Sequence, residues 1–148
     1  MRPRIEEFIE RNGIQNVVMR PYQPRSRLGE LIALGDAHLV LVADGFEGLL
    51  IPSKFYGILA AGRPTIYVGP PNTEVAEVIS SEDCGFVVEN GSGASLVEAI
   101  TVLRNEPLLA YAMGLRGRRA LEHGYAMREL CGEWRRLLQS VGWQGQAD

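Results

Sequence analysis

Short apolar runs alternate along this chain with segments of helical periodicity. Residues 37–43, 65–68 and 86–88 form β-prone runs, and each is followed by apolar positions at helical spacing. The run 37–43 is nearly continuous, which is typical of a parallel strand buried on both faces. A further short β-prone run, residues 17–19, precedes them and is closed by prolines. The pattern therefore predicts four strands.

Helical patterns fill the segments between and beyond these strands. We expect helices over 4–11 and 26–35, from about 53 to 62, after Asn72 as N-cap, from about 94, and over two segments beyond Pro107 divided near 123–124. Strands that alternate with helices predict an α/β fold, a Rossmann-like parallel sheet with flanking helices, followed here by a C-terminal helical pair. Ligands of such sheets bind outside the carboxyl ends of the strands. We therefore expect functional residues in the loops 20–24, 43–53, 69–74 and 89–93.

Composition and charge narrow the class of protein. The 148 residues are 46% hydrophobic and 22% charged, which fits one globular domain and is too apolar for a disordered acidic segment. No run approaches the roughly 18 uncharged residues that a membrane helix needs. The formal charge of -3 removes the global attraction on which nonspecific nucleic-acid binding depends, so we expect no nucleic-acid partner.

The termini and cysteines favour a reduced cytoplasmic compartment. The first residues are charged and lack the apolar core of a secretion signal. Cys84 and Cys131 lie far apart, with no His or Cys nearby at metal-ligand spacing. We therefore expect no metal site and two structural cysteines.

Ser53 and Lys54 are the first candidates for chemistry, because they stand at a predicted helix start after a strand and loop. Backbone N–H groups at a helix N-terminus attract an anion, and an adjacent ammonium adds a mobile positive charge. A diphosphate would fit there. The alternative is that Ser53 only caps the helix and Lys54 is solvated.

A longer pattern surrounds these two residues. It reads Pro-Ser-Lys-Phe-Tyr-Gly-Ile-Leu-Ala-Ala-Gly-Arg-Pro, then Gly-Pro-Pro-Asn-Thr-Glu-Val-Ala and Cys-Gly-Phe-Val-Val. It resembles the nucleotide-sugar-binding half of retaining GT-B glycosyltransferases of family 4, in the branch of bacterial capsule, colanic-acid and O-antigen assembly. The resemblance runs from about Asn16 to Leu138. It implies that residues 1–140 are part of a donor-binding domain and that 141–148 form a tail.

The resemblance also implies the reaction and the partners. A hexosyl or related group would pass from a nucleotide diphosphate sugar to a glycan or lipid-linked acceptor, without any other cofactor. The family's donor domain opens with a strand, a glycine-rich loop and a second strand that are not found before Asn16. The acceptor domain also lies outside these residues. We therefore expect a missing N-terminal domain or a partner chain, and no activity of this chain alone.

Site residues follow from the resemblance position by position. Ser53 and Lys54 would face the donor diphosphate or the donor sugar, with Lys54 catalytic. Tyr22 and Gln23 would lie near the nucleobase. Thr73 and Glu74 would approach the donor sugar. The alternatives are loop packing for Tyr22 and a helix-dipole role for Glu74.

The family usually carries two glutamates with seven residues between them, and this chain departs from that pattern. The second position falls on Gly57, which we keep as a donor-binding candidate, and the first falls on Leu49. Glu47, two residues earlier, is the one acid that can stand in as the catalytic glutamate.

Two alternatives stay open at the level of the whole protein. The chain could be a noncatalytic or split subunit that needs a separate acceptor-domain partner, or a sugar-nucleotide epimerase of the same fold. Arg116, Arg118 and Arg119 could form a solvated helix face or attract the protein to the inner face of a membrane.

Overall fold

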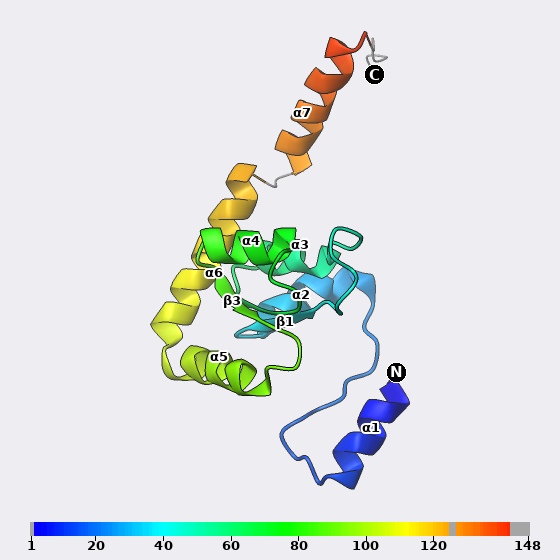
Figure 1. The fold of residues 1–148 in the computed structure, drawn as a ribbon, viewed down its shortest axis with the longest axis vertical. Helices are drawn as coiled ribbons and strands as arrows, with labels where there is room; N and C mark the ends of the chain where they lie inside the picture. The colour runs from blue at the N-terminus through cyan, green and yellow to red at the C-terminus, as the bar shows by residue number, and fades with distance from the viewer. Residues whose placement is uncertain (1, 125–126, 143–148) are drawn as a thin grey trace.

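The computed structural model describes residues 2–124 and 127–142. Its helices are α1 (Arg2–Arg11), the 3-10 helix η1 (Arg25–Arg27), α2 (Leu28–Leu34), α3 (Ser53–Ala60), α4 (Glu74–Ser81), α5 (Gly93–Asn105), α6 (Pro107–Gly124) and α7 (Met127–Ser140). Its strands are β1 (His38–Leu41), β2 (Thr65–Val68) and β3 (Gly85–Val88) (Figure 1). The expected C-terminal helical pair is confirmed, with α6 ending at Gly124.

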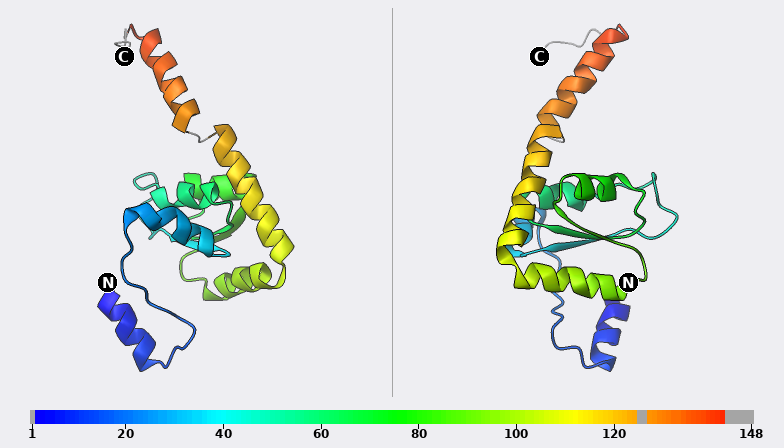
Figure 2. Two further views of the ribbon diagram at one scale, coloured as in Figure 1. Left: turned by 180° about the vertical axis from the view of Figure 1, so that it is seen from behind. Right: turned by 60° about the vertical axis from the view of Figure 1, so that its left-hand side comes forward.

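The three strands form one parallel sheet in the order β1-β2-β3. Helices α3 and α4 lie on one face of this sheet and α5 lies on the other (Figure 2). Helix α6 packs against both α3 and α5 and joins the two layers. The expected α/β class, a parallel sheet with flanking helices, is therefore confirmed.

The core lies on both sides of the central strand β2, whose four residues are all buried. Successive side chains of a strand point to opposite faces. Tyr67 accordingly packs with Phe55 in the cluster under α3 and α4, while Ile66 packs with Leu103 under α5. Each such side chain stabilises the fold by roughly 1.5–3 kcal/mol relative to its exposed state. The two clusters hold the strand ends, and with them the loops, in place.

The prediction of a strand at residues 17–19 is wrong for this structure. These residues belong to an extended linker between α1 and η1, with Val18 68% exposed. A β-prone run forms a strand only when a neighbouring strand accepts its backbone hydrogen bonds, and no strand of the described residues lies beside it.

The prediction that the first strand is buried on both faces is also wrong. Val40 is buried, but Leu39 and Leu41 on the opposite face are 39% and 68% exposed. The reason is the position of β1 at the edge of the sheet, where α3 packs on one face and α5 packs against β2 and β3. One face of β1 is therefore exposed, although its apolar sequence is typical of a strand that is buried on both faces.

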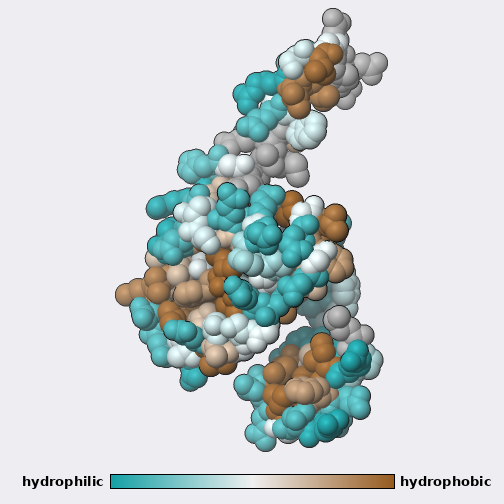
Figure 3. All heavy atoms as spheres, viewed as in Figure 1, coloured by the Kyte–Doolittle hydropathy of each residue, from teal (hydrophilic) through white to brown (hydrophobic). Residues whose placement is uncertain are grey.

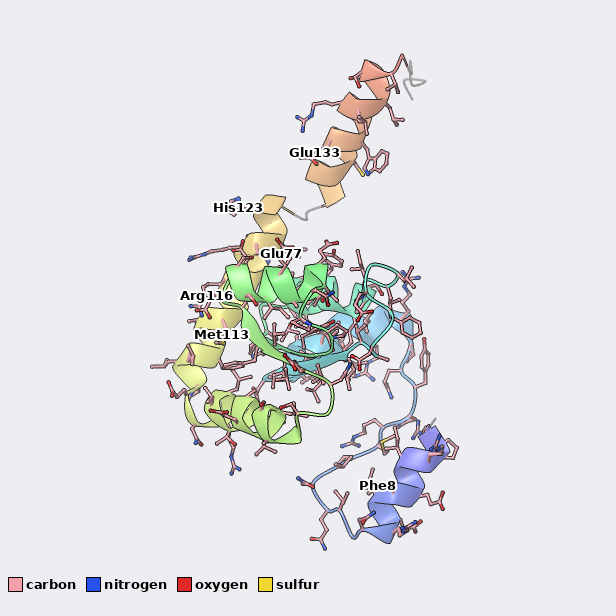
Figure 4. All side chains as sticks on the ribbon, in the orientation of Figure 1. Phe8, Glu77, Met113, Arg116, His123 and Glu133 are labelled. Carbon is pink, nitrogen blue, oxygen red and sulfur yellow. The ribbon has the colours of Figure 1, made fainter. Side chains whose placement is uncertain are left out.

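Helices α1 and α7 extend away from the α/β body. Phe8 on α1 and Glu133 on α7 lie at opposite ends of the molecule (Figure 4). Apolar side chains gather on one side of α1, where Phe8 is 61% exposed (Figure 3). Within the described residues, no helix is both long enough and apolar enough to cross a membrane. Of the expected tail at 141–148, residues 143–148 lie outside the described part.

Candidate functional site

Three of the predicted functional loops meet at the carboxyl ends of the strands. They enclose a cavity of about 290 Å³, which we call the polar cavity, lined by Asp44, Glu47, Asn72, Glu89, Asn90 and the Gly69-Pro70-Pro71 turn. A smaller cavity of about 130 Å³ is lined by Pro52, Tyr67, Thr73, Glu74 and neighbouring apolar residues. Of the eight site residues expected from the sequence, Glu47, Thr73 and Glu74 line these two cavities.

Asn90 ties the loops after β1 and β3 together. Its side-chain amide Nδ2 donates to Asp44 Oδ1 at 2.8 Å and to the backbone oxygen of Val42 at 3.0 Å. One amide group thus spans the end of the central strand and fixes both walls of the polar cavity. The sequence pattern marked residues 89–93 as a functional loop, yet did not single out Asn90, because this contact joins segments 46 residues apart.

The polar cavity is acidic. Asp44, Glu47 and Glu89 line it, and the lining contains no basic side chain. Carboxylates accept hydrogen bonds from hydroxyl groups, whereas they repel a diphosphate. This cavity therefore suits the hydroxyl groups of a sugar or a ribose better than the charged part of a nucleotide.

Thr73 is the N-cap of α4 and corrects the expectation for Asn72. Its Oγ1 accepts from the backbone N–H of Ala76 at 3.3 Å and lies 3.0 Å from the hydroxyl of the buried Tyr67. An N-cap bond of this kind stabilises a helix by about 1 kcal/mol. The cap fixes where α4 begins and so orients the next residue, Glu74.

Glu74 is held at the start of α4 by a tyrosine from the neighbouring helix. The hydroxyl of Tyr56 donates to Glu74 Oε1 at 3.2 Å. Its place in the first turn also suits the helix dipole, so the functional and the stabilising interpretations of Glu74 both fit this geometry. Tyr56 lies in the motif discussed above, but sequence spacing gave no sign that it would reach Glu74.

Ser53 and Lys54 begin α3 as expected but do not line either cavity. The N-cap of α3 is Pro52, and no side chain caps this end, so the capping alternative for Ser53 is wrong. Lys54 Nζ donates to the backbone oxygen of Leu39 at 3.3 Å, on the edge strand. In this arrangement its ammonium caps the sheet edge rather than facing the polar cavity.

The remaining expected residues lie elsewhere. Gly57 faces α2, where a Cβ would lie 3.1 Å from Cδ1 of Ile32, so its small size serves helix packing. Tyr22 is 90% exposed, and Gln23 bonds the backbone oxygen of Pro21 in its own segment. None of these three lines either cavity. Their roles at the donor remain predictions.

Metal ligands are not grouped in the part of the chain that the structure describes. There, no group of three or more His, Cys, Asp and Glu side chains could hold a metal ion.

Comparison with known proteins places this geometry in a fold class. The chain superposes on sucrose-phosphate synthase from Thermosynechococcus elongatus with a TM-score of 0.73, covering 95% of this chain and 35% of the other, at 19% sequence identity. That likeness shows the fold, which is that of part of a GT-B glycosyltransferase. No protein-family model matches the sequence.

A sequence match agrees with the fold. Over 98 residues the chain is 30% identical to a protein of Escherichia coli (strain K12) described as the colanic acid biosynthesis glycosyl transferase WcaI. The match covers 66% of this chain and 24% of the relative, so the chain spans about a quarter of that protein. The two comparisons together support a partial GT-B glycosyltransferase domain, as the sequence motifs predicted.

Proposed function

We propose that this chain supplies the donor-binding loops of a glycosyltransferase that acts in the cytoplasm on a nucleotide diphosphate sugar. The observation that carries the proposal is the polar cavity at the carboxyl ends of a parallel sheet, where this fold class binds ligands. The acceptor, a glycan or a lipid-linked sugar, would be bound by a separate domain or chain of the same enzyme.

Each group has a role in this proposal. Asp44, Glu47 and Glu89 would accept hydrogen bonds from hydroxyl groups of the donor, and Asn90 would keep the cavity walls in place. Transfer breaks the bond between the anomeric carbon and the diphosphate oxygen and forms a bond to an acceptor oxygen, which loses its proton. Lys54 would stabilise the departing diphosphate after its ammonium leaves the Leu39 oxygen.

Ligand-observed and amide NMR with UDP, GDP and UDP-glucose tests the donor site. We expect weak binding, with shifts confined to residues 44–54, 69–74 and 89–93. Replacing Asn90→Ala removes the bond to Asp44 and should weaken binding about fivefold, the value of a typical hydrogen bond. Asn105→Ala, at the end of α5, is the matched control and should bind as the parent chain does.

Other outcomes would contradict the proposal. Shifts far from these three loops would place the site elsewhere. Epimerisation of the sugar nucleotide without any acceptor would instead support an epimerase of the same fold. Binding without transfer in the presence of every partner domain would support a noncatalytic subunit.

A further inference from the structure

Tyr56 connects the beginnings of two helices that lie on the same face of the sheet (Figure 2). It stands in the first turn of α3, and Glu74 is the first residue of α4. The hydroxyl of Tyr56 donates to Glu74 Oε1 at 3.2 Å. Glu74 lines the smaller cavity of the candidate site, and Asn72, just before it in the same loop, lines the polar cavity. The tyrosine therefore acts on a carboxylate that belongs to the candidate site.

The core holds the ring of Tyr56 in place. The neighbouring Phe55 is 1% exposed, and the centroids of the two rings lie 5.7 Å apart with an angle of 57° between the ring planes. Tyr56 is itself half-buried and packs against the buried cluster under α3 and α4. A tyrosine side chain has few rotatable bonds, so a packed ring also fixes where its hydroxyl lies.

Glu74 needs such a partner because its own side chain is exposed. An exposed glutamate samples several rotamers, and fixing it in one of them costs conformational entropy. Thr73 fixes only the backbone at the start of α4, through its cap bond to the N–H of Ala76. The bond from Tyr56 holds the carboxylate itself. The backbone and the side chain of Glu74 are thus set by two different elements.

A tyrosine hydroxyl has the right chemistry for holding a carboxylate that must still bind something else. It donates to an ionised carboxylate without bringing a positive charge, as a lysine or an arginine would. A carboxylate has two oxygens with about four lone-pair sites, so one bond from a tyrosine leaves acceptor capacity for a second donor. A hydroxyl group of a sugar is a donor of this kind.

We propose that Tyr56 is a positioning residue for the donor sugar. Its hydroxyl holds the Glu74 carboxylate in the orientation that accepts a hydrogen bond from a hydroxyl group of the sugar. The inference rests on the proposed function, in which residues 69–74 belong to the donor site. Because the carboxylate is ordered before the ligand arrives, binding of the sugar is not weakened by the cost of ordering it. Tyr56 therefore affects the contribution of the sugar to the affinity and not that of the nucleotide.

Comparing a nucleotide with its sugar conjugate separates these two contributions. NMR titration of the full chain gives dissociation constants for UDP, UDP-glucose, GDP and GDP-mannose, and the pair with the tighter-binding nucleotide sugar is used for the variants. Tyr56→Phe should weaken binding of the nucleotide sugar roughly two- to tenfold, the effect of having to immobilise one more side chain on binding. Its affinity for the nucleotide alone should stay the same.

Two further variants test whether Tyr56 acts through Glu74. Glu74→Ala, at an exposed side chain, should weaken binding of the nucleotide sugar. Adding Tyr56→Phe to Glu74→Ala should have no further effect, because the tyrosine then has no carboxylate to hold. Tyr111→Phe on α6 is the matched control, since Tyr111 is 63% exposed and lines neither cavity of the candidate site. It should bind both ligands as the parent chain does.

Three results would overturn the inference and leave the proposed function standing. The parent chain could bind the nucleotide and the nucleotide sugar equally well, which would exclude a sugar contact at Glu74. Tyr56→Phe could weaken both ligands equally, which would give Tyr56 a general structural role. It could also lower the melting temperature and leave both dissociation constants unchanged, which would leave Glu74 only its helix-dipole role. If the parent chain binds none of the four ligands, the proposed function and the inference both fail.

Discussion

The two cysteines of the chain lie in opposite environments. Cys84 is fully buried beside Gly117, and burial raises the pKa of its thiol to about 11, whereas Cys131 on α7 is exposed. A thiol reacts as the thiolate, so a buried thiol with a raised pKa is inert. The expected role of Cys84 as a small structural residue agrees with this environment.

Thiol titration with an aromatic disulfide at pH 8 should therefore give two phases. Cys131 should react at once, and Cys84 on the order of a hundredfold more slowly until denaturant is added. Cys131→Ser should abolish the fast phase and leave the slow one. Equal rates for both thiols in the native chain would contradict the burial of Cys84.

His38 links the edge strand to α2. Its Nε2 lies 2.7 Å from the Ile32 oxygen, and burial is the largest cause that lowers the pKa of His38 from its usual 6.5. The hydrogen bond to Ile32 opposes this shift, whereas the positive charges of Lys54 and Arg63 add to it. A lowered pKa means that the unfolded chain binds a proton more readily than the folded chain. The contribution of His38 to stability is then complete above pH 6.5 and is lost as the pH falls below it.

Urea unfolding at pH 8 and pH 5.5 checks this sign. The loss of unfolding free energy between the two pH values should be smaller for His38→Gln than for the parent chain, because glutamine keeps a donor but does not titrate in this range. His123→Gln, at the exposed end of α6, serves as the control and should retain the parent's pH dependence. A larger loss of unfolding free energy in His38→Gln than in the parent chain would contradict a lowered pKa of His38.

At the scale of elements, the joint between α3 and α6 depends on a glycine contact. Gly114 of α6 lies against the backbone of Gly62 just after α3, and a Cβ at residue 114 would collide with the Gly62 oxygen and approach Arg63 Cα to 3.1 Å. Helix α6 is the element that packs against both layers. The close approach of Gly114 to Gly62 therefore fixes the position of α6 relative to the two helical layers.

Gly114→Ala should destabilise the chain by about 1–3 kcal/mol, the range for overpacking a core. Gly132→Ala on α7 is the matched control, because nothing lies within 4 Å of its Cβ position. It should leave the unfolding midpoint unchanged or raise it, since alanine favours a helix by about 1 kcal/mol over glycine. Equal urea midpoints for the two variants would contradict the close contact.

At the scale of the whole molecule, the chain supplies the donor-binding groups of the reaction that we propose. The loops that line the polar cavity all come from one sheet. An enzyme of the proposed kind also needs groups that bind the acceptor and remove its proton. The isolated chain should therefore transfer no labelled sugar from a nucleotide sugar to a lipid-linked acceptor, even where nucleotide binding is measurable. Transfer by the chain alone would contradict the proposal that a separate domain or chain binds the acceptor.

Much of the fold could be predicted from the sequence, because it rests on local patterns. The runs 65–68 and 86–88 became β2 and β3, and the helical spacing placed α3 and α5 within a few residues. The motif around Ser53 and Lys54 led to the GT-B resemblance that both comparisons support. These features depend on neighbours in the sequence, which the pattern records directly.

The tertiary structure alone decided which distant residues meet. Asn90 reaches Asp44, Tyr56 reaches Glu74, and Lys54 turns to the Leu39 oxygen instead of the polar cavity. Burial also depended on three-dimensional neighbours. A continuous apolar run predicts a strand that is buried on both faces. Only the packed sheet shows that α3 covers one face of β1 and that the other face is exposed. Side-chain contacts across the sheet are set by packing, and packing is a property of the whole chain rather than of any segment.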